Sequence, residues 1–390
     1  MPHAGGSNSP LLSAAINLTR DGIVGAWDTS AGAITVPPGG LGSASDADTG
    51  YLRRGTRGVL FDHQLIPSIS VDIDGDQVTV SHRGARTQQP LATVVKPNDT
   101  TLKAQLPYLK TYADLRQDRI AEINLQASDL MSFFGAIGYI DNARRVKTGE
   151  VMDAVFRMVV TTEMQVKHLA RTLRPIDLSP QVQPVIQTPD HSAYPSGHAT
   201  EAYIIATVLD RLMTGRSAAA GLAAGAQVYR LAYRIASNRT VAGVHFPMDS
   251  AAGAVLGCAL GEHLFRLAIG FPGREPLPTY DPNVDPDDPS QPRGDFGPND
   301  ALGLISPAAS GLEARTEAQE AIMAQMLAPS LTRSAVQPNI EAFNTANAAL
   351  PEADRISDLT YSAVRKGHRD SMNTPFGAFY RDAYAEWPKL

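Results

Sequence analysis

Between about residue 108 and residue 270, apolar residues recur at steps of three and four positions. This spacing places apolar side chains on one face of an α-helix, whereas a half-buried strand would show strict alternation. Helices are expected over 108–144, 150–172, a stretch after His198, 217–235 and 249–267. The sequence therefore predicts a mainly α fold, a helical bundle whose core spans residues 106–272.

Three glycines in the last of these helices, Gly253, Gly257 and Gly261, stand four residues apart. Residues at this spacing lie on one helical face, so the glycines leave that face flat. A neighbouring helix can then approach closely. In a membrane this pattern favours helix dimerisation, but here we expect a helix buried in a protein core.

Residues 1–105 are rich in Gly, Ser, Thr, Asp and Pro. Apolar and polar residues alternate in 69–73 and 78–80, on either side of the sequence Asp74-Gly75-Asp76. Alternation around an Asp-Gly turn is typical of a β-hairpin. We expect an irregular, partly β N-terminal segment.

Residues 273–390 open with a loop rich in Pro and Asp, followed by predicted helices over 311–327 and 340–350. Five aromatic residues lie in the last twenty positions. They are Phe376, Phe379, Tyr380, Tyr384 and Trp387. Such a tail is expected to dock on the core or on a second subunit, and the latter would make the protein a homo-oligomer.

The formal net charge of the chain is -6. General nucleic-acid binding needs a basic surface, so we expect no nucleic-acid partner, and any cationic site must be local.

The lone cysteine, Cys258, lies in an apolar run and is expected to be a small buried core residue. Because residues 1–10 lack the pattern of a signal peptide and no stretch reaches the roughly 18 uncharged apolar residues of a membrane helix, we expect a cytoplasmic protein without a membrane partner.

Lys167 and Arg174 are two cationic residues seven positions apart, and Pro175 follows directly. Two helical turns separate them, so both should project from one helical face before Pro175 ends the helix. Taken alone, the pair is typical of a solvated basic face. An anion opposite the pair would explain it equally well.

Ser196, Gly197 and His198 stand immediately before an apolar helical stripe. Free backbone N–H groups and the helix dipole at such a position favour an anion, and a glycine lets the backbone approach it. Ser196 would serve equally as an ordinary N-cap. His198 adds a titratable imidazole suited to proton transfer.

Arg239, His245 and Asp249 form the third segment, with His245 and Asp249 four residues apart. A carboxylate at that spacing can accept from one ring nitrogen and raise the basicity of the other. A lone His–Asp pair is more often structural. The three segments together, however, supply the cations, helix N-terminus and imidazoles that a tetrahedral or trigonal-bipyramidal oxyanion requires.

The order Lys-x6-Arg-Pro, Pro-Ser-Gly-His and Arg-x5-His-x3-Asp resembles the superfamily of type 2 phosphatidic acid phosphatases and vanadium haloperoxidases. The resemblance covers about 167–249 and implies a helical bundle with a catalytic core. Asn238 stands where the family usually has serine, a position not expected to take part in chemistry.

The resemblance also implies roles. His245 would bond the central phosphorus or vanadium, and Asp249 would orient it. His198 would be the acid–base group. The remaining residues would bind the oxygens of phosphate or vanadate: Lys167, Arg174, Ser196, Gly197 and Arg239.

Several features favour the haloperoxidase branch, with vanadate as cofactor and hydrogen peroxide and halide, bromide first, as substrates. His191 stands five residues before Ser196, as in the algal bromoperoxidases that the chain resembles, and Ala199-Thr200 follows the histidine as in haloperoxidases. Lys167 would polarise bound peroxide. We expect His191 to line a halide or substrate pocket, although a loop histidine capping a carbonyl would look the same.

One feature favours the phosphatase branch. Known haloperoxidases have Trp three residues before the motif lysine, where this chain has Met164, which peroxide would oxidise. Met164 is expected to line the same pocket as His191. The alternative is a phosphatase that hydrolyses a phosphate ester through a phosphohistidine. A non-catalytic descendant would be expected to lack one of the motif residues, and none is missing.

Overall fold

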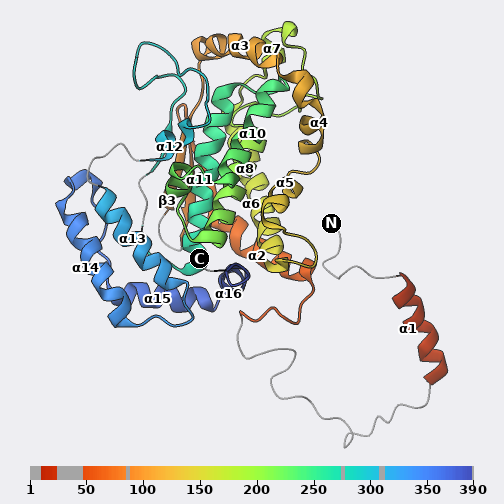
Figure 1. The fold of residues 1–390 in the computed structure, drawn as a ribbon, viewed down its shortest axis with the longest axis vertical. Coiled ribbons are helices and arrows are strands. Elements are labelled where there is room, and N and C mark those ends of the chain that lie inside the picture. Colours follow the sequence, from red (N-terminus) through yellow and green to blue (C-terminus); the bar gives the residue numbers. More distant parts are fainter. Residues whose placement is uncertain (1–9, 24–46, 85–87, 274–276, 307–311, 389–390) are drawn as a thin grey trace, which may run out of the picture.

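The computed structural model describes residues 10–23, 47–84, 88–273, 277–306 and 312–388. Over these residues the chain is mainly α-helical and carries one four-stranded sheet (Figure 1). This architecture confirms the predicted mainly α fold with a partly β N-terminal segment. Within the predicted segment 1–105, residues 1–9, 24–46 and 85–87 lie outside the described residues. The predicted domain boundaries stay a prediction.

Two long helices, α8 (Gly197–Thr214) and α11 (Pro247–Ile269), form the centre of the bundle. They are flanked by α6 (Val146–Ala170) and α10 (Gln227–Val241), which both pack against α8. The apolar stripe predicted after His198 is buried in α8. The four helices α6, α8, α10 and α11 thus form one packed group, although they come from separate parts of the sequence (Figure 1).

The glycine face of α11 lies directly against α8, as predicted. A Cβ atom at Gly257 would lie 2.5 Å from the carbonyl oxygen of Thr200, and one at Gly253 would lie 2.8 Å from the carbonyl oxygen of Ser196. Gly261 meets Thr207 further along. The two helices therefore run parallel at a separation that only glycine allows.

Helix α11 is long and apolar enough to cross a membrane by length and composition, and among the described helices it alone meets that test. In this structure, 89% of its most apolar window is buried inside the protein. Helix α8 covers its glycine face, and the sheet covers another part of it. Its apolar character is therefore accounted for by its place in the protein core.

The sheet has the order β1-β2-β3-β4. Strands β1 (Ile69–Asp74) and β2 (Gln77–Arg83) form the predicted hairpin, with Gly75 at φ 56° in the turn. The sequence did not predict β3 (Gln88–Val95) or β4 (Thr279–Tyr280), which pair in parallel. Strand β3 lies on α11, so the sheet covers one side of the bundle.

Two helices predicted as continuous are interrupted. The stretch 108–144 forms parts of α3 (Asp99–Ala113), α4 (Arg116–Gln126) and α5 (Met131–Gly138). The stretch 217–235 is divided between α9 (Ala218–Ala223) and α10. Gly225, in a left-handed conformation at φ 61°, turns the chain between these two.

The C-terminal part contains α12 (Asp300–Ile305), α13 (Glu313–Met326), α14 (Arg333–Ala349), α15 (Tyr361–Met372) and α16 (Pro375–Tyr384). Helix α14 begins seven residues before the predicted 340. Helices α13 and α14 pack on each other beside the bundle (blue, Figure 1). The remaining helices are α1 (Pro10–Ile23), α2 (Arg54–Leu65), α7 (Pro175–Leu178) and the short 3-10 turns η2 (Ile66–Ser68), η3 (Pro180–Val182) and η4 (Glu352–Asp354).

The aromatic tail docks on the core, as one of the two predicted arrangements. The rings of Phe376 and Phe379 lie with centroids 5.8 and 5.1 Å from that of Phe61. The Trp387 indole donates to Thr148 Oγ1 at 3.1 Å, at the start of α6. The tail therefore supports the N-terminal end of the helix that carries Lys167.

Because α8 and α11 pack so closely, one methyl group added at their interface should destabilise the fold. Gly257→Ala should lower the free energy of unfolding by about 2 kcal/mol, because overpacking outweighs the helix propensity gained. Gly303→Ala is the matched control, since a Cβ atom there meets nothing within 4 Å and the residue is exposed on α12. Urea denaturation measures both. Equal stabilities of the two variants would contradict this packing.

Candidate functional site

The three sequence segments converge at one end of the bundle. Lys167 lies in the last turn of α6, Ser196 and Gly197 begin α8, and Arg239 lies in the last turn of α10. His245 stands just before α11 and Asp249 lies in its first turn. The five polar or charged residues named here are buried, and so is Arg174. The six are Lys167, Arg174, Ser196, Arg239, His245 and Asp249.

Arg174 reaches the site by a route that differs from the prediction. Helix α6 ends at Ala170 because Arg171 adopts a left-handed conformation at φ 50°. Arg174 is therefore in extended backbone as the N-cap of α7, and the prediction that it shares a helical face with Lys167 was wrong. Its guanidinium nevertheless turns back to donate to the carbonyl of Val244 at 2.9 Å, beside His245.

His245 and Asp249 form the predicted pair. His245 Nδ1 lies 3.1 Å from Asp249 Oδ2, which also accepts from the amide of Phe246 at 2.9 Å. On the other side of the ring, His245 Nε2 lies 3.1 Å from Arg174 Nη1. A guanidinium can only donate, so Nε2 must accept and the ring proton must be on Nδ1.

The charge state of His245 agrees with this tautomer. Burial, with the nearby cations Arg174 and Lys167, holds the pKa of His245 well below its ordinary value. Burial raises the pKa of Asp249, while the amide of Phe246 and the same two cations oppose that rise. The imidazole is therefore neutral, with its Nε2 lone pair directed towards cationic groups. That is the state needed to bond an electrophilic phosphorus or vanadium.

Lys167 is fixed by the loop that precedes α8. Its ammonium group donates to the carbonyl of Ser192 at 3.2 Å and to that of Pro195. Burial lowers the pKa of Lys167 to about 8; the charge of Arg174 also lowers it, whereas that of Glu163 raises it. Lys167 is thus a buried cation that loses its charge as the pH rises through about 8.

Ser196 and Gly197 form the N-terminal end of α8. Ser196 Oγ accepts from the amide of Ala199 at 3.4 Å, as an N-cap does. A Cβ atom at Gly197 would lie 2.6 Å from Glu163 Oε1, so a larger residue there would displace the Glu163 carboxyl group. The sequence did not single out Glu163.

His198 is half-buried, and its Nε2 donates to the carbonyl of Gln126 at 3.2 Å. Burial lowers the pKa of His198, and the nearby charge of Arg239 lowers it further. Nε2 is bound to the backbone, so Nδ1 is the ring nitrogen left for proton exchange. Nδ1 lies 3.8 Å from Glu201 Oε2.

Arg239 contacts α4, which carries no recognisable motif. Its Nη2 donates to the carbonyl of Ile123 and to Gln126 Oε1, both at 3.2 Å. Its Nε is buried and has no hydrogen-bond partner within the described part of the chain. Gln126 also accepts from Asn238 Nδ2 at 3.0 Å, so Asn238 helps to position Gln126 at the site. Sequence analysis missed Gln126 because only the packing of α4 on α10 brings it there.

A cavity of about 580 Å³ opens onto two of the site cations, Lys167 and Arg174. Both predicted pocket residues line it: Met164 from α6, and His191, whose Nδ1 lies 3.2 Å from Arg174 Nη2. His191 Nδ1 also lies 3.3 Å from the carbonyl of Ser192, the contact expected of a loop histidine that caps a backbone carbonyl. The cavity offers small molecules a path to the buried cations.

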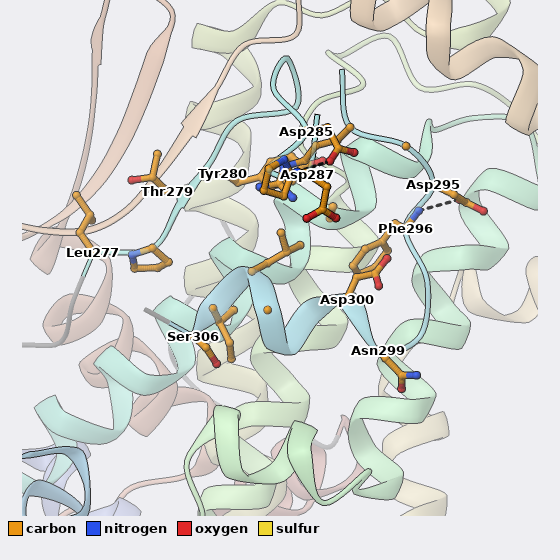
Figure 2. Close-up of a pocket in the computed structure, with 18 residues that line it drawn as sticks. Leu277, Thr279, Tyr280, Asp285, Asp287, Asp295, Phe296, Asn299, Asp300 and Ser306 are labelled. Atoms are coloured by element: carbon orange, nitrogen blue, oxygen red, sulfur yellow. Dashed lines mark hydrogen bonds between the residues drawn. The ribbon is translucent and has the colours of Figure 1, made fainter. Parts of the chain in front are cut away.

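A second cavity, of about 680 Å³, lies where the loop after β4 passes over α12 (Figure 2). Its charged lining is mostly acidic, with four aspartates beside Arg293: Asp285, Asp287, Asp295 and Asp300. None of the site residues predicted from the sequence lines it. The cationic residues predicted to bind an oxyanion therefore lie away from this cavity.

The residues present fit an oxyanion better than a metal cation. Within the described ranges, no group of three or more His, Cys, Asp or Glu residues is arranged to hold a metal ion. The site instead offers three buried cations, the start of α8 and the unprotonated Nε2 of His245. Cys258 is remote in α11, where burial raises its pKa to about 12, as expected for an unreactive core residue.

The pKa of Lys167 predicts how anion affinity depends on pH. As the pH rises through about 8, Lys167 loses its charge, and the affinity for inorganic phosphate should fall by up to about tenfold per pH unit. Lys167→Arg keeps its charge over this range and should show a smaller fall. Calorimetric titrations between pH 7 and 9.5 compare the two proteins. Parallel curves would show that Lys167 does not cause the dependence.

Part of the chain matches the model of a known protein family. A search among curated proteins finds no match to the chain. Residues 152–269 contain the three motifs and the four helices that carry them, except the first turns of α6. This segment matches the family model of the PAP2 superfamily.

Proposed function

We propose that the chain is a vanadium-dependent haloperoxidase, which uses hydrogen peroxide to oxidise halide, bromide first. The observation that carries this proposal is the position of His191. It lies against Arg174 and lines the cavity that opens onto Lys167, as the resemblance to bromoperoxidases implies. Peroxide and halide are both small enough to reach the buried cations through that cavity.

The residues present suit vanadate as the cofactor. His245 Nε2 would bond vanadium, and Asp249 would keep the ring in the required tautomer. Five residues would bind the oxygens: Lys167, Arg174 and Arg239 by charge, Ser196 by its hydroxyl and Gly197 by its amide. When bound, vanadate activates peroxide for the two-electron oxidation of halide, in which peroxide is reduced to water.

The protein's own part in this reaction is binding and proton control. Lys167 and Arg174, which line the cavity, attract the halide by charge, and their N–H groups can donate hydrogen bonds to the uncharged peroxide. His198 Nδ1 exchanges protons with the oxyanion, because His198 Nε2 is bound to Gln126. The low pKa of His198 is expected to rise when a bound anion offsets Arg239, so that the imidazole becomes able to carry a proton.

A phosphatase is the second candidate, and two observations favour it. The cavity of about 580 Å³ is larger than peroxide and halide require and would hold the alcohol part of a phosphate ester. Met164, 39% exposed on its wall, is open to oxidation by peroxide. In this reaction His245 Nε2 would attack phosphorus, the ester P–O bond would break, and His198 would protonate the leaving alcohol. Water would then hydrolyse the phosphohistidine.

Paired assays on one metal-free preparation distinguish the two. Peroxide-dependent bromination of a dye and hydrolysis of p-nitrophenyl phosphate are measured before and after orthovanadate is added. We expect bromination to appear with vanadate and to be lost in His245→Ala. Fast ester hydrolysis that vanadate only inhibits would instead identify a phosphatase and contradict the first proposal.

A further inference from the structure

Two buried carboxyl groups lie beside the site and have no part in the roles above. Glu163 stands one helical turn before Lys167 on α6, and Glu201 stands three residues after His198 on α8. The residues are only 5% and 8% exposed. A buried carboxylate is costly unless it is paired with a cation or hydrogen-bonded, so each requires an explanation.

Neither carboxyl group has the partner that burial would lead us to expect. Among the described residues, Glu163 Oε2 has no hydrogen-bond partner, and neither glutamate is within ion-pair distance of a lysine or arginine. Glu163 Oε1 instead lies against Gly197, the first residue of the helix that carries His198. The contact that Glu201 does make is with His198, whose Nδ1 is 3.8 Å from Glu201 Oε2.

The charged groups that face the pair come from three helices. Lys167 on α6, His198 on α8 and Arg239 on α10 surround Glu201, and Glu163 and Glu201 repel each other when both are ionised. Burial raises the pKa of Glu201 to about 7 and that of Glu163 well above its ordinary value. Burial and mutual repulsion therefore favour a protonated carboxyl group in this pair.

We propose that Glu163 and Glu201 form a buried proton store, and that Glu201 passes its proton to His198 Nδ1. The step breaks the O–H bond of Glu201 and forms an N–H bond on His198. His198 then donates that proton to the oxyanion or to a leaving alcohol. The charge of an ionised Glu201 raises the pKa of Glu163, so Glu163 keeps its proton when Glu201 has given its own away. Glu201 is thus a positioning and proton-supplying residue behind His198.

The arrangement serves either of the two reactions, so the inference rests on a histidine oxyanion site but not on the choice between them. Both reactions require a proton to be delivered at His198. In both, the arrival of an anion makes the surroundings more negative and favours proton uptake by the pair. The number of protons taken up on anion binding is therefore a readout that a merely structural role of Glu201 would not change.

Glu201→Gln tests the proposal directly, because glutamine keeps the shape of the side chain but cannot release a proton. Turnover, in whichever assay the wild type is active, should fall at least about tenfold. Orthovanadate affinity should change less than about threefold, since no anion contact is lost. Calorimetry near pH 7 in buffers of different ionisation enthalpy should show fewer protons taken up than in the wild type.

Two further variants keep the test decisive. Glu163→Gln should also reduce proton uptake while leaving the contact of Glu201 with His198 intact. Glu150→Gln is the matched control, since Glu150 is equally buried on α6 but pairs with Arg57 at 2.7 Å, away from the site. It should lower the melting temperature and leave the proton count unchanged. Melting curves establish that each variant is folded.

The outcomes separate the relay from the proposed function. Wild-type rate and proton uptake in folded Glu201→Gln would overturn the relay and leave the oxyanion site standing. If Glu201→Gln and Glu150→Gln lose proton uptake equally, the effect is structural and the relay is also wrong. If the wild type binds no orthovanadate, the proposed function fails, and the relay fails with it.

Discussion

The contact between α8 and α11 determines where every other part of the site lies. Their glycine-lined interface holds the two helices parallel, and the amide of Ser196 donates to the carbonyl of Asp249 at 2.9 Å where they begin. Both helix N-termini therefore point to the same place. The partial positive charge of each adds to the field at this point, which favours an anion before any side chain is considered.

The side chains then intensify that field at the expense of stability. Three cations and an imidazole are buried together, and burial acts against every charge among them. The structure limits this cost in two ways. His245 stays neutral, and backbone carbonyls accept from Lys167, Arg174 and Arg239. A bound oxyanion would compensate the remaining charge, so we expect anion binding to stabilise the fold as well as to prepare the reaction.

Much of this could be predicted from the sequence, because the motifs combine local spacing with unusual residue types. The pairing of His245 with Asp249 follows from a four-residue step that the start of α11 preserves. Residues outside the motifs could not be predicted. Gln126 reaches the site only through the packing of α4 on α10. Glu201 lies three residues after His198 on α8, but no motif marks it. Arg174 shows a third case: its side chain lies beside His245, whereas the helical position predicted for it was wrong.

The central claim is that His245 is neutral, with an unprotonated Nε2 that bonds the central atom of an oxyanion. Nitrogen-15 NMR of histidine-labelled protein measures this directly, with His245→Gln to assign the signal among nine histidines. We predict that Nε2 of His245 is unprotonated in the free protein and that its resonance shifts when orthovanadate is added. A protonated Nε2, or a shift confined to another histidine, would contradict the account.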